Sequence, residues 1–250
     1  NHLAAGDIDN DGRDEIIIGA PFVNAENRED AGRVYVVPVP RDGGTLDLAA
    51  GGDWSEMTGS ARKDALGFQV AASDVNGDGV ADVIAGARDA DGPGDAINNA
   101  GEVNVWLGGD SLPSSTDLLK GQSDSIIIGT NPGDSYGFSV AAGDLNADGI
   151  ADILSGAPIA DGCNEAQTDA GDAYAVFGRD PLPSAIYLKN RGDLTFLGAE
   201  AGDAVGFSVA TGDFNGDGKA DAIIGALQAD GPGNQRQDAG EAYIVLNHGQ

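Results

Sequence analysis

The stretch DIDNDGRDEIIIGA, residues 7–20, places five acidic side chains in nine residues directly before an apolar run. Carboxylates at this density repel one another unless a cation lies among them. The pattern recurs as SDVNGDGVADVIAGA from Ser73, GDLNADGIADILSGA from Gly143 and GDFNGDGKADAIIGA from Gly212. The first aspartates of the four copies are separated by 67, 70 and 69 residues, and a period of this length indicates a repeat architecture.

Other landmarks keep the same register. An aromatic-glycine step precedes three copies, and a small-residue turn with an apolar strand follows every copy, as in DAGRVYVV from Asp30 and DAGEAYIVL from Asp238. Looser runs lie between units: TLDL at Thr45, TDLLK at Thr116 and AIYLK at Ala185. Each unit therefore reads as four short strands separated by turn residues, which predicts the blades of an all-β propeller. A β-sandwich or a solenoid is the alternative.

The predicted organisation is one domain with approximate repeats 1–65, 66–135, 136–204 and 205–250, and the last repeat lacks a fourth strand. Four blades give the simplest closed ring. The alternative is half of a larger propeller completed by a second chain, which would make the protein a homodimer.

These landmarks resemble the FG-GAP repeat of the integrin α-subunit propeller. The FG steps are Gly67-Phe68, Gly137-Phe138 and Gly206-Phe207, and the GAP triplets are Gly19–Pro21 and Gly156–Pro158. The chain departs from the family in having four units where integrin propellers have seven blades, and the first unit lacks the FG step. The resemblance implies an adhesion or ligand-binding role, and an extracellular, cell-surface or periplasmic location.

Oxygen-bearing side chains occupy positions 1, 3, 5 and 9 of each acidic loop, and a glycine occupies position 6. Ca²⁺ takes six to eight oxygen ligands, and related loops add the backbone carbonyl of position 7. The predicted ligands are Asp7, Asp9, Asp11, the Arg13 carbonyl and Glu15; Asp74, Asn76, Asp78, the Val80 carbonyl and Asp82; Asp144, Asn146, Asp148, the Ile150 carbonyl and Asp152; and Asp213, Asn215, Asp217, the Lys219 carbonyl and Asp221.

Up to four Ca²⁺ ions are therefore expected. The EF-hand alternative needs flanking helices and a Glu at position 12, and neither is present. Mg²⁺ is less favoured because it keeps most of its water. A metal-free turn rich in Asp and Asn is the remaining alternative. The first loop alone has Asp9 and Glu15 in place of an Asn and an Asp, so we expect its calcium affinity to differ from the others.

Charge and composition argue against several classes of function. The chain carries 41 acidic against 13 basic side chains and a net charge of −28, which opposes binding to nucleic acid and to anionic membranes. No apolar run is long enough for direct membrane insertion. The two histidines, His2 and His248, lie near the ends of the sequence, so a Ser-His-Asp or Cys-His site is not expected. We predict a non-enzymatic protein; the alternatives are a carbohydrate-active enzyme or lyase domain and a purely structural module.

A protein or glycan ligand is expected on the face opposite the calcium loops, where long loops connect the second and third strands of each unit. Aspartates that repeat in register there are expected to brace turns. The better ligand-binding candidates break the register: Arg28, Asp95, Cys163, Glu165 and Arg236. Trp54 and Trp106 could line a sugar site, although Trp in sheets is usually packed in the core.

Overall fold

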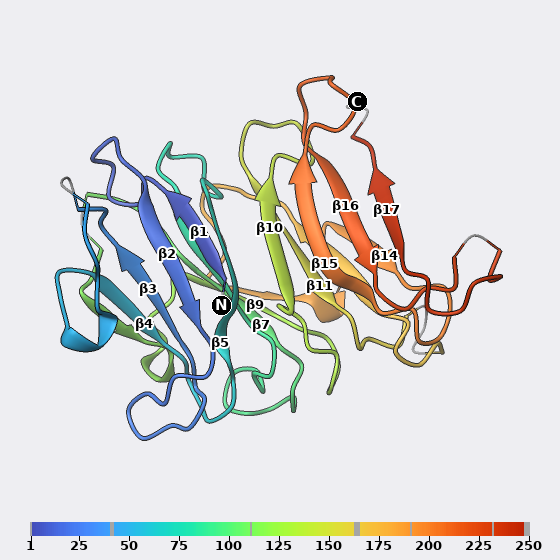
Figure 1. Cartoon of the computed structure of the whole chain (residues 1–250), viewed down its shortest axis with the longest axis horizontal. Helices are drawn as coiled ribbons and strands as arrows, with labels where there is room; N and C mark the ends of the chain where they lie inside the picture. Colours follow the sequence, from blue (N-terminus) through green and yellow to red (C-terminus); the bar gives the residue numbers. More distant parts are fainter. Residues whose placement is uncertain are drawn as a thin grey trace.

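The protein folds into four consecutive β-sheets that lie side by side (Figure 1). The computed structural model describes residues 2–40, 43–110, 112–162, 166–190, 192–231 and 233–247. Blade one contains β1 (Leu3–Gly6), β2 (Glu15–Ala20), β3 (Arg33–Val37) and β4 (Ser55–Thr58). Blade two contains β5 (Leu66–Ser73), β6 (Asp82–Ala87), β7 (Glu102–Trp106) and β9 (Ser125–Ile128).

Blades three and four continue the same order. Blade three contains β10 (Ser139–Gly143), β11 (Asp152–Ala157), β12 (Asp172–Val176) and β14 (Leu194–Leu197). Blade four contains β15 (Val205–Gly212), β16 (Asp221–Ala226) and β17 (Glu241–Val245). Neighbouring strands within each blade pair antiparallel. The four all-β units predicted from the repeat are confirmed, with three strands in the described part of the last.

Two short strands leave their own unit and join the preceding blade. The strand β8 (Ser115–Asp117) pairs parallel with β4, and β13 (Ala185–Tyr187) pairs parallel with β9. Each is followed by one turn of 3-10 helix, η2 (Leu118–Lys120) and η4 (Leu188–Asn190). In blades two and three the connection between the third and fourth strands is therefore more than a turn, because it contains a segment that pairs with the preceding blade. The corresponding TLDL run of blade one leads into the 3-10 turn η1 (Leu48–Ala50).

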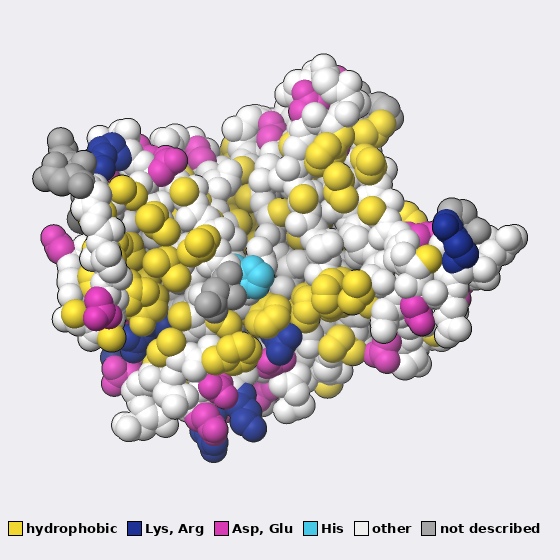
Figure 2. Space-filling model, in the orientation of Figure 1, with side chains coloured by type: hydrophobic (Ala, Val, Ile, Leu, Met, Phe, Trp, Pro, Cys, Tyr) yellow, Lys and Arg dark blue, Asp and Glu magenta, His cyan; other side chains and the backbone are white. Residues whose placement is uncertain are grey.

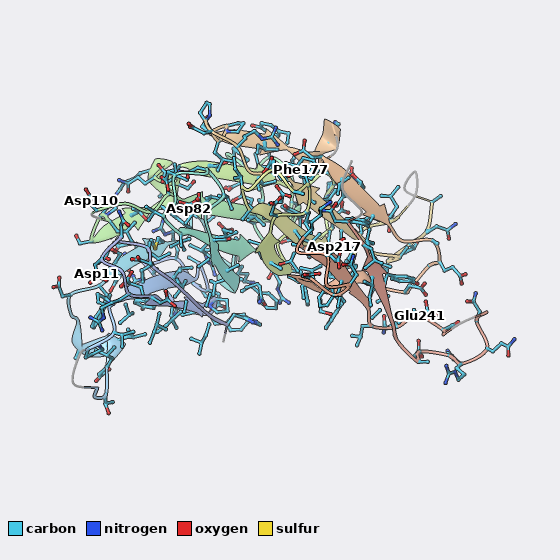
Figure 3. The ribbon with its side chains drawn as sticks, turned by 90° about the horizontal axis from the view of Figure 1, so that it is seen from above. Asp11, Asp82, Asp110, Phe177, Asp217 and Glu241 are labelled. Atoms are coloured by element: carbon cyan, nitrogen blue, oxygen red, sulfur yellow. The ribbon has the colours of Figure 1, made fainter. Side chains whose placement is uncertain are left out.

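The blades form an open arc. The innermost strands contact one another in the order β1, β5, β10 and β15, and within the described chain β15 makes no more than marginal contact with β1. From above, the blades follow a curved row from the first sheet to the last (Figure 3). The four expected blades are present, and within the described residues the first and the fourth do not close a ring.

Burial along the central strands reflects the number of neighbouring blades. Every residue of β6 and β11 is buried, because blades two and three are covered on both faces. Burial alternates along β2, and most of β17 is exposed, because the end blades are covered on one face. The two largest apolar clusters accordingly span the junctions between blades one and two and between blades two and three.

Glycines set the distance between adjacent blades. A Cβ atom on Gly19 or Gly86 would overlap the carbonyl oxygen of Gly67 or Gly137 in the next blade. Gly67 and Gly137 also have φ of +81° and +82°, which L side chains rarely adopt. The phenylalanines that follow these glycines form a row, with ring centroids 5.0 Å apart between Phe68 and Phe138. The repeated Gly-Phe and Gly-Ala steps therefore allow the inner strands to approach closely.

Candidate metal centres

The four acidic loops lie at the same end of the strands in every blade, so they share one face of the arc. Each connects the first two strands of its blade, so the shared strand direction brings all four loops to the same end. Figure 3 views this end, and its labels Asp11, Asp82 and Asp217 belong to loops of three different blades. The sheets thus act as supports that hold the predicted ligand loops at separate positions.

The first aspartate of each loop organises the turn through backbone hydrogen bonds. In the second loop, Asp74 Oδ1 accepts from the N–H groups of Gly77 at 2.6 Å and Asp78 at 3.2 Å, and its Oδ2 accepts from Gly79 N–H at 2.7 Å. Equivalent bonds reach Asp7, Asp144 and Asp213. The loop therefore wraps around this carboxylate, as expected for Asx turns and for cation-binding loops alike.

Positions 3 and 5 contact each other. In loops two, three and four the Asn amide donates to the Asp Oδ2 at 2.9, 2.9 and 3.0 Å. Loop one has Asp9 at position 3, which has no amide to donate, and its Oδ1 accepts from Asp11 N–H at 3.1 Å. Loop one consequently holds more uncompensated negative charge than the other three.

The position 9 aspartates are fully buried. Asp82 Oδ2 accepts from Val75 N–H at 2.8 Å, and its Oδ1 accepts from Gly108 N–H at 2.9 Å. Burial raises the pKa of Asp82 to about 6. The two hydrogen bonds oppose this rise, and the negative charges of Asp78 and Asp74 add to it. Asp152 has the same environment and a pKa of about 6, and Asp221 makes equivalent bonds to Phe214 and Asn247. These carboxylates tie each loop to the connection that follows the third strand.

Loop one brings three carboxylates together. Asp7, Asp9 and Glu15 each offer an oxygen within 4.8 Å of the other two, and this is the one such acidic, His or Cys cluster found in the described ranges. Glu15 is buried, and its Oε2 accepts from Ile8 N–H at 3.0 Å. Burial is the main cause that raises the pKa of Glu15, and the charge of Asp9 adds to it. A set of hard oxygen donors of this kind suits Ca²⁺.

The residues at position 7 of loops two, three and four bond to their own loops through the backbone N–H. The N–H groups of Val80, Ile150 and Lys219 donate to the position 5 aspartates at 2.9, 2.9 and 3.0 Å. The Arg13 side chain instead points out of loop one and donates from Nη2 to Val39 O at 2.8 Å. That the four carbonyls bind an ion stays a prediction.

The register-breaking candidates that the structure describes, Arg28, Asp95 and Arg236, belong to the loops of the opposite end. Arg28 is buried and pairs with Asp117 at 2.9 Å, so its register break has a structural reason and the expectation of an accessible ligand contact at Arg28 is wrong. Asp95 and Arg236 are exposed, whereas Cys163 and Glu165 lie outside the described residues. Trp106 lies instead at the acidic end, where it pairs with Val83 next to Asp82; it is buried, and its Nε1 donates to Gln122 O at 2.9 Å, which fits core packing.

The repeated aspartates of this end brace turns. Asp91, Asp161 and Asp230 each accept from the N–H eight residues later, at 2.6, 3.2 and 2.9 Å. Asp64 is buried and accepts from Ser60 Oγ at 2.5 Å and from Ala61 N–H at 2.7 Å. Their recurrence therefore has a local structural cause.

A buried polar pair in blade two was missed by sequence reasoning. Glu102 and Asn104 are 4% and 0% exposed, and with Asp95 they line a recess of about 480 Å³ at this end. Burial first, and then the charge of Asp64, raises the pKa of Glu102 to about 7. The sequence feature that could have revealed this pair is Asn104, because the other three units have Tyr at the same register.

The fold and its loops define a class: a β-propeller built from repeated hairpins that carry an acidic loop at one end. The FG-GAP repeat family model matches residues 1–37, 66–106, 136–176 and 205–245, and the chain belongs to this family. The family resemblance seen in the sequence is thereby confirmed. No helix of the described chain is long and apolar enough to cross a membrane.

The chain is similar to curated proteins of two kinds, integrin alpha subunits and phosphatidylinositol-glycan-specific phospholipases D. Integrin alpha-5 of Xenopus laevis is 30% identical over 232 residues, which cover 87% of this chain and 20% of that protein. Phosphatidylinositol-glycan-specific phospholipase D of Bos taurus is 30% identical over 172 residues, which cover 68% of this chain and 20% of that protein. Integrin alpha-PS2 of Drosophila melanogaster is 29% identical over 161 residues. The chain spans about a fifth of the length of the first two of these relatives.

Proposed function

We propose that the protein is a calcium-binding propeller that acts outside the cytoplasm as a non-enzymatic ligand-binding or adhesion module. The observation that carries this proposal is the set of four acidic loops, held in register by hydrogen bonds at one end of the sheets. Bound cations would neutralise these loops and stabilise each hairpin. The opposite end, with its long loops, would then be available for a protein or glycan ligand.

Loop one is proposed as the tightest site. Its ligands would be Asp7, Asp9, Asp11, the Arg13 carbonyl and Glu15, and the close approach of three of these carboxylates supports the assignment. In the other loops an Asn amide replaces one carboxylate and contacts the position 5 aspartate. Affinity for Ca²⁺ rises with the number of charged ligands, so loop one should fill first.

The names of the relatives support a recognition role. Integrins and a phospholipase share this segment, although their names describe different whole proteins, and the segment covers about a fifth of each. A common segment in proteins of different activity is more consistent with binding than with one chemistry. The recess beside Asp95 and Glu102 is the proposed contact region, since it lies among the loops opposite the acidic end.

Calorimetry and thermal unfolding test the calcium proposal. EDTA should lower the melting temperature, and Ca²⁺ should restore it more fully than Mg²⁺ at equal concentration. An ion at 100 times its Kd adds about 2.7 kcal/mol, which corresponds to about 5 °C or more for a chain of this size. An unchanged melting temperature in EDTA, together with no heat of Ca²⁺ binding, would contradict the proposal.

A matched pair of substitutions assigns the tightest site. Asp9→Asn gives loop one the Asn of the other copies, and it should weaken the tightest Ca²⁺ binding while leaving the weaker sites unchanged. Asn76→Asp makes the reciprocal change in loop two and should strengthen one weaker site. The assignment fails if Asp9→Asn leaves the tightest affinity unaltered.

A further inference from the structure

The third strands of blades three and four each carry an acid and, two residues later, a tyrosine that bonds to it. Tyr174 Oη donates to Asp172 Oδ2 at 3.0 Å, and Tyr243 Oη donates to Glu241 Oε2 at 2.6 Å. Alternate residues of a strand lie on the same face of the sheet, which places each ring beside the carboxylate. The fold therefore contains two examples of a phenol held by an acid at this register.

Blade two keeps the acid and lacks the tyrosine. Glu102 and Asn104 occupy these two registers, and both are buried. Neither amide atom of Asn104 has a hydrogen-bond partner of good geometry, although the amide lies close enough to Glu102 to oppose part of the rise in its pKa. A buried polar group without a partner is costly. The pair therefore lacks the hydroxyl that the tyrosines of blades three and four supply.

The buried acid and amide line the recess of about 480 Å³ described above, which we call the blade two recess. Pro93, Asp95 and Leu119 also line it and are exposed, so they lie at its opening. Leu118 and Ile126 add apolar surface inside. The recess thus combines an aliphatic wall with one buried acid and one buried amide.

The recess at the same register of blade three differs in two side chains. It has a volume of about 420 Å³, and Tyr174 is part of its lining with its hydroxyl already bonded to Asp172. Lys189 takes the place of Leu119. Of these two recesses, the one in blade two has the acid without a tyrosine donor and the more apolar opening.

A phenol has the chemistry that this lining requires. One tyrosine hydroxyl can donate a hydrogen bond to the Glu102 carboxylate and accept one from the Asn104 amide. The ring would cover the aliphatic wall, since aromatic rings bury a large apolar area. A sugar also offers hydroxyls, but the described lining contains no aromatic side chain against which the apolar face of a sugar ring would stack. The internal acid–tyrosine pairs therefore favour a phenol.

We propose that the blade two recess binds a tyrosine side chain of a partner protein, flanked by neutral or basic residues. The tyrosine hydroxyl bonds to Glu102 and Asn104, and its ring packs against Leu118 and Ile126. Asp95 at the opening and the net charge of −28 disfavour acidic flanks. Figure 2 shows acidic side chains, with a few basic ones, along the lower end of the molecule, where Figure 1 places the loops of this end. This inference rests on the proposed ligand-binding function and names the group that is bound.

Two small probes that differ by one hydroxyl test the proposal. The whole chain, isotopically labelled and loaded with Ca²⁺, is titrated by NMR with N-acetyltyrosine amide and with N-acetylphenylalanine amide at pH 8, where Glu102 is ionised. We expect saturable binding of one tyrosine probe per chain and at least tenfold weaker binding of the phenylalanine probe, because the acid and the amide then lack their shared partner. Chemical shifts should change in residues 92–95 and 118–123. No saturable binding, equal binding of the two probes, or shifts confined to other regions overturns the proposal.

Variants of the chain locate the contact. Asn104→Tyr installs the residue of the other three units and should abolish binding, because its ring fills the recess and its hydroxyl bonds to Glu102; the melting temperature should stay the same or rise. Glu102→Gln should weaken binding of the tyrosine probe about fivefold or more, because a charged acceptor forms the stronger hydrogen bond. Glu241→Gln, the same change in blade four, should leave binding unaltered. Binding that survives either Asn104→Tyr or Glu102→Gln unchanged overturns the proposal.

A pair of peptides tests the flanking residues. Acetylated and amidated KGYGK and EGYGE are titrated under the same conditions. The basic peptide should bind more tightly, and the difference should shrink as salt is added, because screening weakens the attraction between exposed charges. Tighter binding of the acidic peptide contradicts the proposed flank.

The methyl glycosides of glucose, galactose and mannose separate this proposal from the broader one. A sugar that binds in place of the tyrosine probe, and no longer binds to Asn104→Tyr, would overturn the tyrosine assignment and leave the proposed ligand-binding function in place. Failure of the calcium proposal shows separately, in a melting temperature that EDTA does not change.

Discussion

Glu102→Gln provides a test of the buried recess in blade two. Burial raises the pKa of Glu102 from 4.5 to about 7. The folded protein therefore keeps a proton that the unfolded chain loses between these two pH values, and the free energy of unfolding falls as pH rises through this interval. The rise in pKa corresponds to a loss of about 3 kcal/mol of stability above pH 7. Gln does not ionise, so the variant avoids this loss.

Urea unfolding at fixed Ca²⁺ measures the effect at pH 4.5, 6 and 8. The free energy of unfolding of Glu102→Gln, relative to the unaltered chain, should increase by about 3 kcal/mol from pH 4.5 to pH 8. Comparing the two chains removes the contribution of the other acids. Glu241→Gln serves as the control, because it removes the acid at the same register of the more exposed blade four. A difference that does not change with pH refutes the assignment of a raised pKa to Glu102.

Two further predictions concern the contacts between segments, and each has its own comparison variant. Gly137→Ala should lower the free energy of unfolding by about 3 kcal/mol or more, because its Cβ would overlap Glu102 O at a φ of +82°. The control Gly133→Ala, at a φ of +91° in open space, should lower it by about 1 kcal/mol. Equal losses in chemical denaturation would contradict the close approach of the blades. Arg28→Met should destabilise the fold by about 2 kcal/mol, because Asp117 loses its buried partner. A double-mutant cycle with Asp117→Asn should give a coupling of about 1 kcal/mol, and zero coupling would show that the pair does not stabilise the fold.

Local patterns predicted most of the fold. The Asp-x-Asn-x-Asp-Gly loops, the Gly-Phe steps and the alternating apolar runs each lie within about a dozen residues, so their hairpins could be read from the chain. The loop ligands could be proposed for the same reason, because Asp74, Asn76, Asp78 and Asp82 are close in sequence. Ion binding by these loops remains to be measured.

Long-range contacts could not be predicted in this way. Arg28 looked available because it breaks the repeat, but its partner Asp117 is 89 residues away. The recess at Glu102 depends on which blade covers it and on the Asn104 that replaces a tyrosine. The runs TDLLK and AIYLK gave no sign that they would join the preceding blade, because a three-residue parallel strand has almost no local signal.

The sequence by itself determined the repeated unit: its period, its hairpins and the acidic loop in each copy, because these depend on residues that are neighbours along the chain. The tertiary structure decided how the units meet. Within the described residues it leaves the arc open between the first and fourth blades, buries Asp82 and Glu102, and covers the outer edges of blades one and two with β8 and β13. These features arise from packing between blades, where residues far apart in sequence exclude water from one another.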